Sequence, residues 1–243
     1  MDDRTVTVWW LAVDKVAEAD WPRLAALLDD AERARAQRFH FARDQQAYVA
    51  AHALGRVLLS SALGGAPQRW RFAVGDHGKP EVEAAAGGGV GSRPRLNLSH
   101  TRGLAAAALT LDHDVGIDVE WLDRAPASMD VARRFFAPSE CAQLVDLPPE
   151  RLTPTFLSFW TLKEAYVKAI GKGLAQPLDS FAFTLEPVSI RFDAVLADDP
   201  ARWLFRRFQP TPGHVAALAL RHPEPSSVRV NLAAREVADL VAA

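Results

Sequence analysis

The sequence contains a single cysteine, Cys141, among 243 residues. One cysteine excludes both an intramolecular disulfide and a multi-cysteine metal site. The chain also lacks an excess of charge of either sign, because 28 Lys and Arg residues face 30 Asp and Glu residues, for a formal net charge of −2. Nonspecific binding to nucleic acid or to an anionic membrane surface requires a concentrated positive field. We therefore expect neither partner.

Long apolar runs are missing as well. No stretch approaches the roughly 20 apolar residues that span a bilayer, and the first residues, Met1 to Arg4, lack the basic and then apolar pattern of a secretory signal. We expect a cytoplasmic protein without a membrane anchor. Because 49% of the residues are apolar, the chain can form the core of one large domain or of two small ones.

Hydrophobic periodicity predicts both strands and helices. Strands are expected at 6–13, 70–74, 96–100, 104–111, 115–120, 181–184, 189–192, 203–209 and 214–220, and helices within 21–61 and at 129–136, 139–147 and 156–170. These elements do not alternate regularly, which favours an α+β fold over a doubly wound parallel sheet. Each half offers strands and one long helix, so we expect two lobes of similar size, 1–114 and 115–243.

The helix expected at 156–170 carries charges where its pattern is apolar. On a helical wheel, Lys163 and Glu164 fall inside the apolar arc, and Lys168 lies at its edge. A solvated Glu164–Lys168 pair, contributing about 0.2–0.5 kcal/mol, is the simpler interpretation. The neighbours are aromatic, however, and a partly buried charge without a partner is costly. These side chains are therefore candidates for ligand binding.

The strand expected at 115–120 contains two carboxylates. Alternation places Ile117 and Val119 on one face and Asp118 and Glu120 on the other. Their Cβ atoms should lie about 7 Å apart, close enough to share one divalent ion. Oxygen ligands favour Mg²⁺ first, with Mn²⁺ possible. An ordinary exposed strand edge would show the same pattern.

Three weaker features accompany these two. Ser99 and His100 end the strand expected at 96–100 with groups that can donate hydrogen bonds to phosphate oxygens. Lys79 and Pro80 form a rigid turn, and Arg35 belongs to an arginine cluster in the first helical region, a residue type suited to phosphate. Each feature alone is also typical of structural residues.

Together and in this order, these segments resemble the Sfp-type 4′-phosphopantetheinyl transferases. The resemblance covers roughly residues 30 to 185. It runs through Gly78-Lys79-Pro80, Leu96-Asn97-Leu98-Ser99-His100, Gly116-Ile117-Asp118-Val119-Glu120, Arg134-Phe135-Phe136, Trp160-Thr161-Leu162-Lys163-Glu164-Ala165-Tyr166-Val167-Lys168, Gly171-Lys172-Gly173-Leu174 and Pro177-Leu178-Asp179-Ser180-Phe181.

The resemblance implies a pseudo-twofold pair of α+β lobes that bind coenzyme A between them with Mg²⁺. It further implies transfer of the phosphopantetheine arm to a serine of an apo acyl or peptidyl carrier protein, with release of adenosine 3′,5′-bisphosphate. Because the nucleophile belongs to the carrier protein, the lack of a Ser-His-Asp or Cys-His arrangement of the chain's own is understandable. With two covalently linked lobes, we expect a monomer.

Carried over residue by residue, the resemblance assigns the site as follows. The metal ligands are Asp118, Glu120 and Glu164, and the coenzyme A contacts are Arg35, Lys79, Pro80, Ser99, His100, Asp118, Lys163 and Lys168. Catalysis falls to Glu164 and Lys168. Glu164 is the preferred base for the serine proton, directly or through a bound water, and Lys168 can take that role if its pKa is depressed.

The sequence departs from the family at Trp121, where members commonly have a basic residue. Carrier docking usually involves an acidic helix, which makes Arg133, Arg134, Phe135 and Phe136 candidates for the docking surface. Two other functions remain open at this point. One is a catalytically silent carrier-binding module, which should have lost a metal carboxylate. The other is a Mg²⁺-dependent nucleotide phosphohydrolase, which should release phosphate without a protein acceptor.

Overall fold

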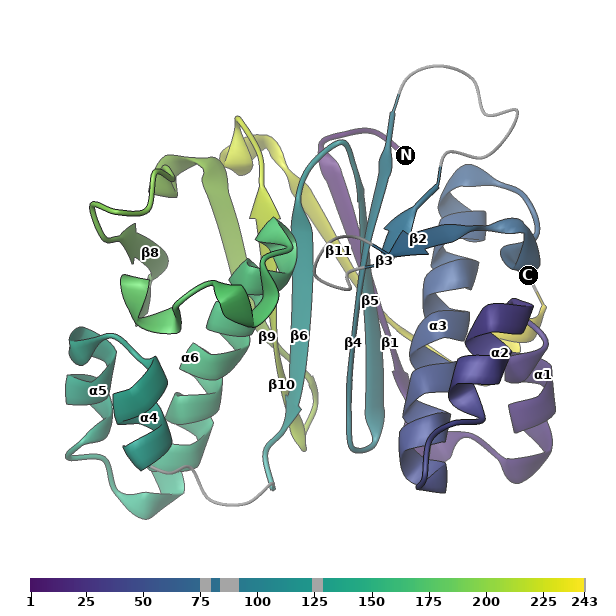
Figure 1. The fold of residues 1–243 in the computed structure, drawn as a ribbon, viewed down its shortest axis with the longest axis horizontal. Helices are drawn as coiled ribbons and strands as arrows, with labels where there is room; N and C mark the ends of the chain where they lie inside the picture. Colours follow the sequence, from purple (N-terminus) through teal and green to yellow (C-terminus); the bar gives the residue numbers. More distant parts are fainter. Residues whose placement is uncertain (75–79, 84–91, 124–128, 243) are drawn as a thin grey trace.

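The computed structural model describes residues 1–74, 80–83, 92–123 and 129–242. Two β-sheets lie face to face in the middle of the molecule, with one long helix outside each sheet (Figure 1). Helix α3 (Ala42–Leu63) covers one sheet and helix α6 (Pro149–Ile170) covers the other. This arrangement confirms the α+β class and the two lobes, each with a sheet packed on a long helix.

The first sheet has four strands in the order β11-β1-β5-β4. Its strands are β1 (Thr5–Ala12), β4 (Pro94–Thr101), β5 (Leu104–Leu111) and β11 (Arg229–Arg235). Strand β5 pairs antiparallel with β1 and β4, whereas β11, from the end of the chain, pairs parallel with β1. Around this sheet lie α1 (Trp21–Ala25), α2 (Asp30–Ala36), α7 (Val237–Val241) and the hairpin of β2 (Phe72–Val74) and β3 (Pro80–Val82).

The second sheet has three antiparallel strands in the order β6-β10-β9. They are β6 (Val115–Trp121), β9 (Trp203–Thr211) and β10 (His214–Arg221). The same lobe holds α4 (Met129–Phe135), α5 (Pro138–Leu144) and the hairpin of β7 (Phe181–Leu185) and β8 (Val188–Phe192). Short 3₁₀ turns occur at Val13–Lys15, Glu18–Asp20, Pro67–Arg69, Gly173–Ala175, Leu178–Ser180, Pro200–Arg202 and Pro225–Ser227.

The apolar core between the two sheets joins the lobes. Val6 and Val8 of β1 meet Ile117 and Val119 of β6 and Leu218 of β10 in one buried cluster. Strand β5 is buried along its whole length, because one face meets this cluster and the other meets α3. Burial of apolar area on both faces of a sheet is the main force that holds such layers together.

Gly116 sets the distance between α6 and β6. A Cβ atom at this position would lie 2.0 Å from the carbonyl oxygen of Ala165 and 2.6 Å from the amide nitrogen of Ala169. Those atoms are helix backbone and cannot move aside as a flexible side chain can. Glycine therefore allows the helix to lie directly on the strand that carries Asp118.

Several regions differ from the sequence-based expectation, and one is β3, a short strand where none was expected. The helix expected at 156–170 begins at Pro149 and includes Pro154, a residue that usually marks a helix boundary. Strand β11 and helix α7 were not predicted, because the residues of β11 are only partly buried or exposed and show no clear apolar alternation. Among the described residues, none of the helices combines the length and apolar character that a membrane span needs.

Candidate functional site

Strand β6 presents Asp118 and Glu120 toward α6. Ile117 and Val119 enter the core between the sheets, and so the alternate residues face the helix, as the alternation predicted. Asp118 is only 6% exposed, whereas Glu120 is half-buried. The strand thus places one deeply buried carboxylate beside a more accessible one.

Helix α6 brings Glu164 and Lys168 to the same place. The Lys168 ammonium donates to Asp118 Oδ1 at 2.6 Å, to Ser99 Oγ at 3.0 Å and to the Ile117 carbonyl oxygen at 3.3 Å. Glu164 lies one helical turn before Lys168, half-buried, near enough to Asp118 and Glu120 for their charges to affect it. Three carboxylates and one ammonium therefore form a single cluster between β6 and α6.

Strand β4 contributes two buried polar side chains to the cluster. Ser99 Oγ donates to Asp118 Oδ1 at 3.2 Å and accepts the Val119 amide at 3.2 Å. Asn97 Oδ1 accepts the Ile117 amide at 2.8 Å. The first lobe thus touches the backbone of the strand that carries the carboxylates.

Asp118 has one oxygen to spare. Its Oδ1 takes bonds from Lys168 and Ser99, but its Oδ2 is buried and has no hydrogen-bond partner among the described residues. A buried carboxylate oxygen without a partner is costly. An all-oxygen donor set with such an atom fits a hard divalent cation such as Mg²⁺.

The pKa values of two carboxylates in this cluster are raised, which opposes their charged forms. Burial raises the pKa of Asp118, and the Lys168 ammonium opposes that rise. Burial also raises the pKa of Glu164, and the nearby charge of Asp118 raises it further. The shift of Glu164, to which the charge of Glu120 also contributes, shows that its neighbouring carboxylates repel its negative charge.

His100 follows Ser99 at the end of β4. His100 remains exposed to solvent, but protein atoms around part of the ring lower its pKa, and the Lys168 ammonium and His52 lower it further. His100 is therefore close to α6 of the second lobe and to α3 of its own. The structure brings Ser99, His100, Asp118, Glu164 and Lys168 together between the lobes.

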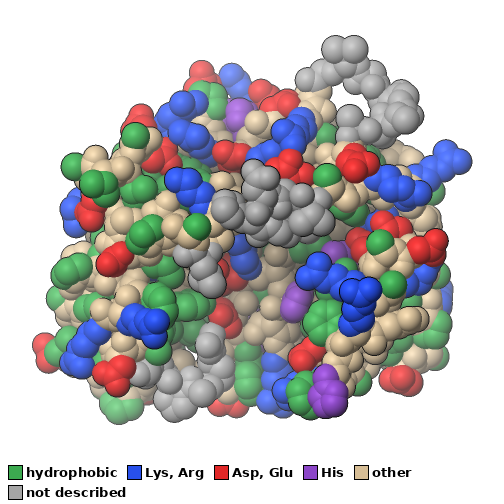
Figure 2. Space-filling model, viewed as in Figure 1, with side chains coloured by type: hydrophobic (Ala, Val, Ile, Leu, Met, Phe, Trp, Pro, Cys, Tyr) green, Lys and Arg blue, Asp and Glu red, His purple; other side chains and the backbone are tan. Residues whose placement is uncertain are grey.

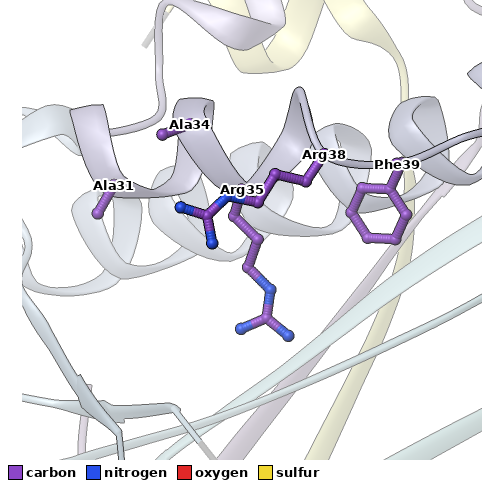
Figure 3. Close-up of a pocket in the computed structure, with 5 residues that line it drawn as sticks. All are labelled: Ala31, Ala34, Arg35, Arg38 and Phe39. Carbon is purple, nitrogen blue, oxygen red and sulfur yellow. The ribbon is translucent and has the colours of Figure 1, made fainter.

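Arg35 lies on α2, at an open pocket of about 580 Å³ lined by Ala31, Ala34, Arg35, Arg38 and Phe39. Figure 3 shows the side chains of both arginines extending from the helix beside this pocket. The Arg35 guanidinium also lies over the ring of Tyr48, 5.8 Å from its centroid. Burial raises the pKa of Tyr48 to about 12, and so its ring stays neutral.

The two rings that lie between this pocket and His100 were not predicted as part of the site. The ring of Tyr48 stacks on His52, with centroids 4.0 Å apart, and the His52 charge in turn affects His100. The only signal in the sequence is a tyrosine and a histidine four residues apart in this helix, a spacing that is too common to single out. Figure 2 shows histidine and Lys or Arg side chains gathered where the surface is hollowed beside the first lobe.

Lys163 points away from this cluster. Its ammonium is fully buried and donates to Glu140 Oε2 at 2.8 Å and to the carbonyl oxygens of Leu178 at 2.6 Å and Phe181 at 2.8 Å. All three ammonium protons are thereby used inside the second lobe. The aromatic neighbours of Lys163 did indicate burial, but the partner is Glu140 and not a ligand, and we assign Lys163 to the core of the lobe.

Other expected residues have different outcomes. Lys79 lies outside the described residues, and Pro80 begins β3. Trp121 has the guanidinium of Arg102 over its ring, 4.3 Å from the centroid, which brings a positive charge to this position. Phe136 is 3% exposed and packs on Phe156, and so it belongs to the core and not to a docking surface.

A second group of possible ligands, Asp3, His113 and His222, lies near the start of β6. The Glu224 amide donates to His222 Nδ1 at 2.9 Å. The neutral ring must then carry its proton on Nε2, which leaves that atom no lone pair for a metal. We therefore place the candidate metal centre at β6 and α6.

Comparison with known proteins identifies the family of this chain. Residues 114–219 match the family model for the 4′-phosphopantetheinyl transferase superfamily, and residues 15–110 match the model for the N-terminal part of 4′-phosphopantetheinyl transferase. The two matches meet close to the turn between β5 and β6.

Curated relatives extend over most of the chain. The 4′-phosphopantetheinyl transferase HetI of Nostoc sp. is 34% identical over 88% of this chain and 87% of its own length. The 4′-phosphopantetheinyl transferase Sfp of Bacillus subtilis is 27% identical over 83% of this chain and 86% of its own. An L-aminoadipate-semialdehyde dehydrogenase-phosphopantetheinyl transferase of Xenopus laevis is 28% identical over 84% of this chain and 72% of its own length. The chain belongs to the 4′-phosphopantetheinyl transferase superfamily and is an enzyme that transfers the phosphopantetheine arm of coenzyme A to carrier proteins.

Proposed function

We propose that the transfer depends on a divalent cation, Mg²⁺ before Mn²⁺, held by Asp118, Glu120 and Glu164. The observation that supports this proposal most directly is the buried Asp118 Oδ2, which has no hydrogen-bond partner among the described residues. The raised pKa of Glu164 beside Asp118 supports it as well, because a cation would relieve the repulsion between the two carboxylates. When bound, the cation would neutralise charge on the diphosphate of coenzyme A.

The chain's own residues have three tasks in the proposed reaction. Lys168 and His100 hold the remaining phosphate charge, since both lie beside the carboxylate cluster. Ser99 orients Asp118 and Lys168 through its hydroxyl. Arg35, exposed at its pocket, takes the 3′-phosphate.

Glu164 is the proposed general base. In the transfer, the carrier serine oxygen forms a bond to the β-phosphorus, and the bond from that phosphorus to the bridging oxygen breaks. Adenosine 3′,5′-bisphosphate leaves, and the serine proton passes to Glu164. A carboxylate whose pKa is raised by burial is a stronger base than an exposed one, which suits this task.

The carrier protein is proposed to dock near α4 of the second lobe. Arg133 and Arg134 are exposed there, and the Arg134 guanidinium lies over the Phe135 ring at 5.2 Å. Their charge is complementary to an acidic carrier helix. We further propose that the protein acts as a monomer whose lobes divide at 114/115, with β11 and α7 returning to the first lobe.

The first test is the intact mass of an apo carrier protein after incubation with this protein, coenzyme A and Mg²⁺. We expect a gain of one phosphopantetheine that EDTA abolishes and that Mg²⁺ in excess restores. Transfer at an unchanged rate in EDTA would contradict the metal proposal. Release of inorganic phosphate without a gain of mass on any carrier would instead favour a phosphohydrolase.

A matched pair of variants tests whether Asp118 is a ligand of the metal. Asp118→Asn should abolish the Mg²⁺-dependent gain, because the amide removes the charge of the buried ligand. Asp193→Asn changes an exposed carboxylate of the same lobe and should leave the rate as it is. Equal rates for the two variants would remove Asp118 from the proposed metal centre.

A further inference from the structure

The strand that carries the carboxylates lies at the edge of its sheet. Within the described part of the chain, β6 pairs with β10 alone, and its other edge faces β4 of the first sheet. Backbone groups of an antiparallel strand point alternately to one neighbour and to the other. The amides of Ile117 and Val119 and the carbonyl of Ile117 consequently point away from β10, toward the first lobe and α6.

Side chains close this edge where a neighbouring strand would normally do so. Strand β4 belongs to a different sheet and pairs with β5. Asn97 Oδ1 accepts the Ile117 amide at 2.8 Å, and Ser99 Oγ accepts the Val119 amide at 3.2 Å. The Ile117 carbonyl accepts the Lys168 ammonium at 3.3 Å. The backbone on both sides of Asp118 is thus fixed by side chains of β4.

Asn97 differs from Ser99 in one respect. Ser99 contacts Asp118 and Lys168 directly, and so its substitution would disturb the charges themselves. The side chain of Asn97 is 95% buried, and its carbonyl oxygen is bonded to backbone only. Any effect of Asn97 on the reaction through this bond must pass through the position of β6.

We propose that Asn97 is a positioning residue, whose carbonyl oxygen holds the Ile117 amide and thereby fixes Asp118 for metal binding. The inference rests on the metal centre proposed above. Cation sites tolerate ligand displacements of only about 0.2 Å. If the edge of β6 were not anchored and moved by more than this, the affinity for the metal would fall. The affinity for the nucleotide would fall less, because the first lobe binds the nucleotide at Arg35.

The variants isolate the acceptor. Asn97→Leu keeps the size of the side chain and removes the acceptor. Thr110→Val is the control for a structural loss, because Thr110 is fully buried and its hydroxyl donates to the Thr5 carbonyl, a bond that joins β5 to β1. Asn231→Ala, at the other asparagine of the chain, is the control for an exposed position.

The measurements are the Mg²⁺ concentration for half-maximal transfer and the affinity for coenzyme A in EDTA. In Asn97→Leu we expect the Mg²⁺ concentration to rise tenfold or more, with the coenzyme A affinity changed less than threefold. Thr110→Val and Asn231→Ala should stay within threefold of wild type for Mg²⁺. A normal Mg²⁺ dependence in folded Asn97→Leu, or an equal rise of the Mg²⁺ concentration in Thr110→Val, would overturn the proposal.

Amide hydrogen exchange gives a test that needs no metal. The Ile117 amide should exchange far more slowly than an exposed amide, and at least tenfold faster in Asn97→Leu where that variant folds. Rapid exchange at Ile117 in wild type would overturn the positioning role. If wild-type transfer is insensitive to EDTA while Ile117 is protected, the metal proposal fails but the anchoring by Asn97 stands, and the two failures are thus distinguished.

Discussion

The charge of Glu164 acts against stability while it serves the site. Its pKa is raised by burial and by Asp118, and so the folded state binds more protons than the unfolded state in the pH range between the two pKa values. The unfolding free energy therefore falls as pH rises through that range. Sites built for chemistry often carry such a cost.

Substitution of Glu164 should expose this cost. We expect Glu164→Gln to have a higher melting temperature than wild type at pH 7 without metal, and to lose that advantage as pH falls toward 4. Transfer should be abolished while some coenzyme A binding remains. Thermal unfolding at several pH values checks the stability, and transfer and binding assays check the activity. A gain in stability that does not depend on pH, or retained turnover, would contradict the role of Glu164 as a buried charged base.

The pair of Lys163 and Glu140 makes a different prediction. Glu140 also accepts the amides of Ala137 at 2.9 Å and Phe183 at 2.8 Å, and burial opposes the charged form of both partners. Lys163→Met leaves a buried carboxylate without its cation and should cost about 3–5 kcal/mol of unfolding free energy. Denaturant unfolding measures this, and the double variant Lys163→Met with Glu140→Gln should recover part of the loss. A weakened coenzyme A affinity in folded Lys163→Met, without a loss of stability, would return Lys163 to the binding site.

Arg35 is predicted to discriminate the 3′-phosphate. Arg35→Ala should raise the KM for coenzyme A about tenfold, the effect of roughly 1.4 kcal/mol, and raise the KM for 3′-dephospho coenzyme A much less. Arg33→Ala is the control on the same helix, because Arg33 is engaged by Asp30 and by the Leu28 carbonyl. Equal effects of Arg35→Ala on both substrates would place the 3′-phosphate elsewhere.

At the scale of elements, the contact of α6 with β6 depends on Gly116. Gly116→Ala would place a methyl group against helix backbone, and overpacking of this kind costs about 1–3 kcal/mol or more. Gly213→Ala is the matched control, since a Cβ atom there has no neighbour within 4 Å among the described residues. Urea unfolding of the two variants should differ by at least 1 kcal/mol, and similar stabilities would mean that α6 can move without cost.

The sequence predicted the elements that bury a regular pattern. The alternation in 115–120 correctly separated Ile117 and Val119 from Asp118 and Glu120, and the periodic helix correctly placed the buried side of α6. The partner of Lys163 could not be found in this way, because Glu140 meets it only through the packing of α5 on α6. Strand β11 could not be predicted for a related reason. Its pairing with β1 joins residues that are far apart in the sequence, and so no local sequence pattern indicates it.

At the scale of the whole molecule, the lobes depend on each other. Val6 and Val8 of β1 are covered by β6 and β10, and the outer edge of β1 is covered by β11. A fragment of residues 1–114 would expose this apolar face and lack one strand. We expect it to show no cooperative unfolding by circular dichroism, whereas the full chain unfolds cooperatively; a fragment that folds on its own would contradict this dependence.

The pairing of β11 with β1 also affects how the protein is made. Thr5 pairs with Arg229, and so the partner strand of β1 is translated more than 200 residues after β1 itself. Until then one edge of β1 has unsatisfied backbone groups and can pair with other chains. The first sheet therefore stays incomplete until β11 has left the ribosome, and slow or interrupted translation between the two strands lengthens the period in which the nascent chain can aggregate.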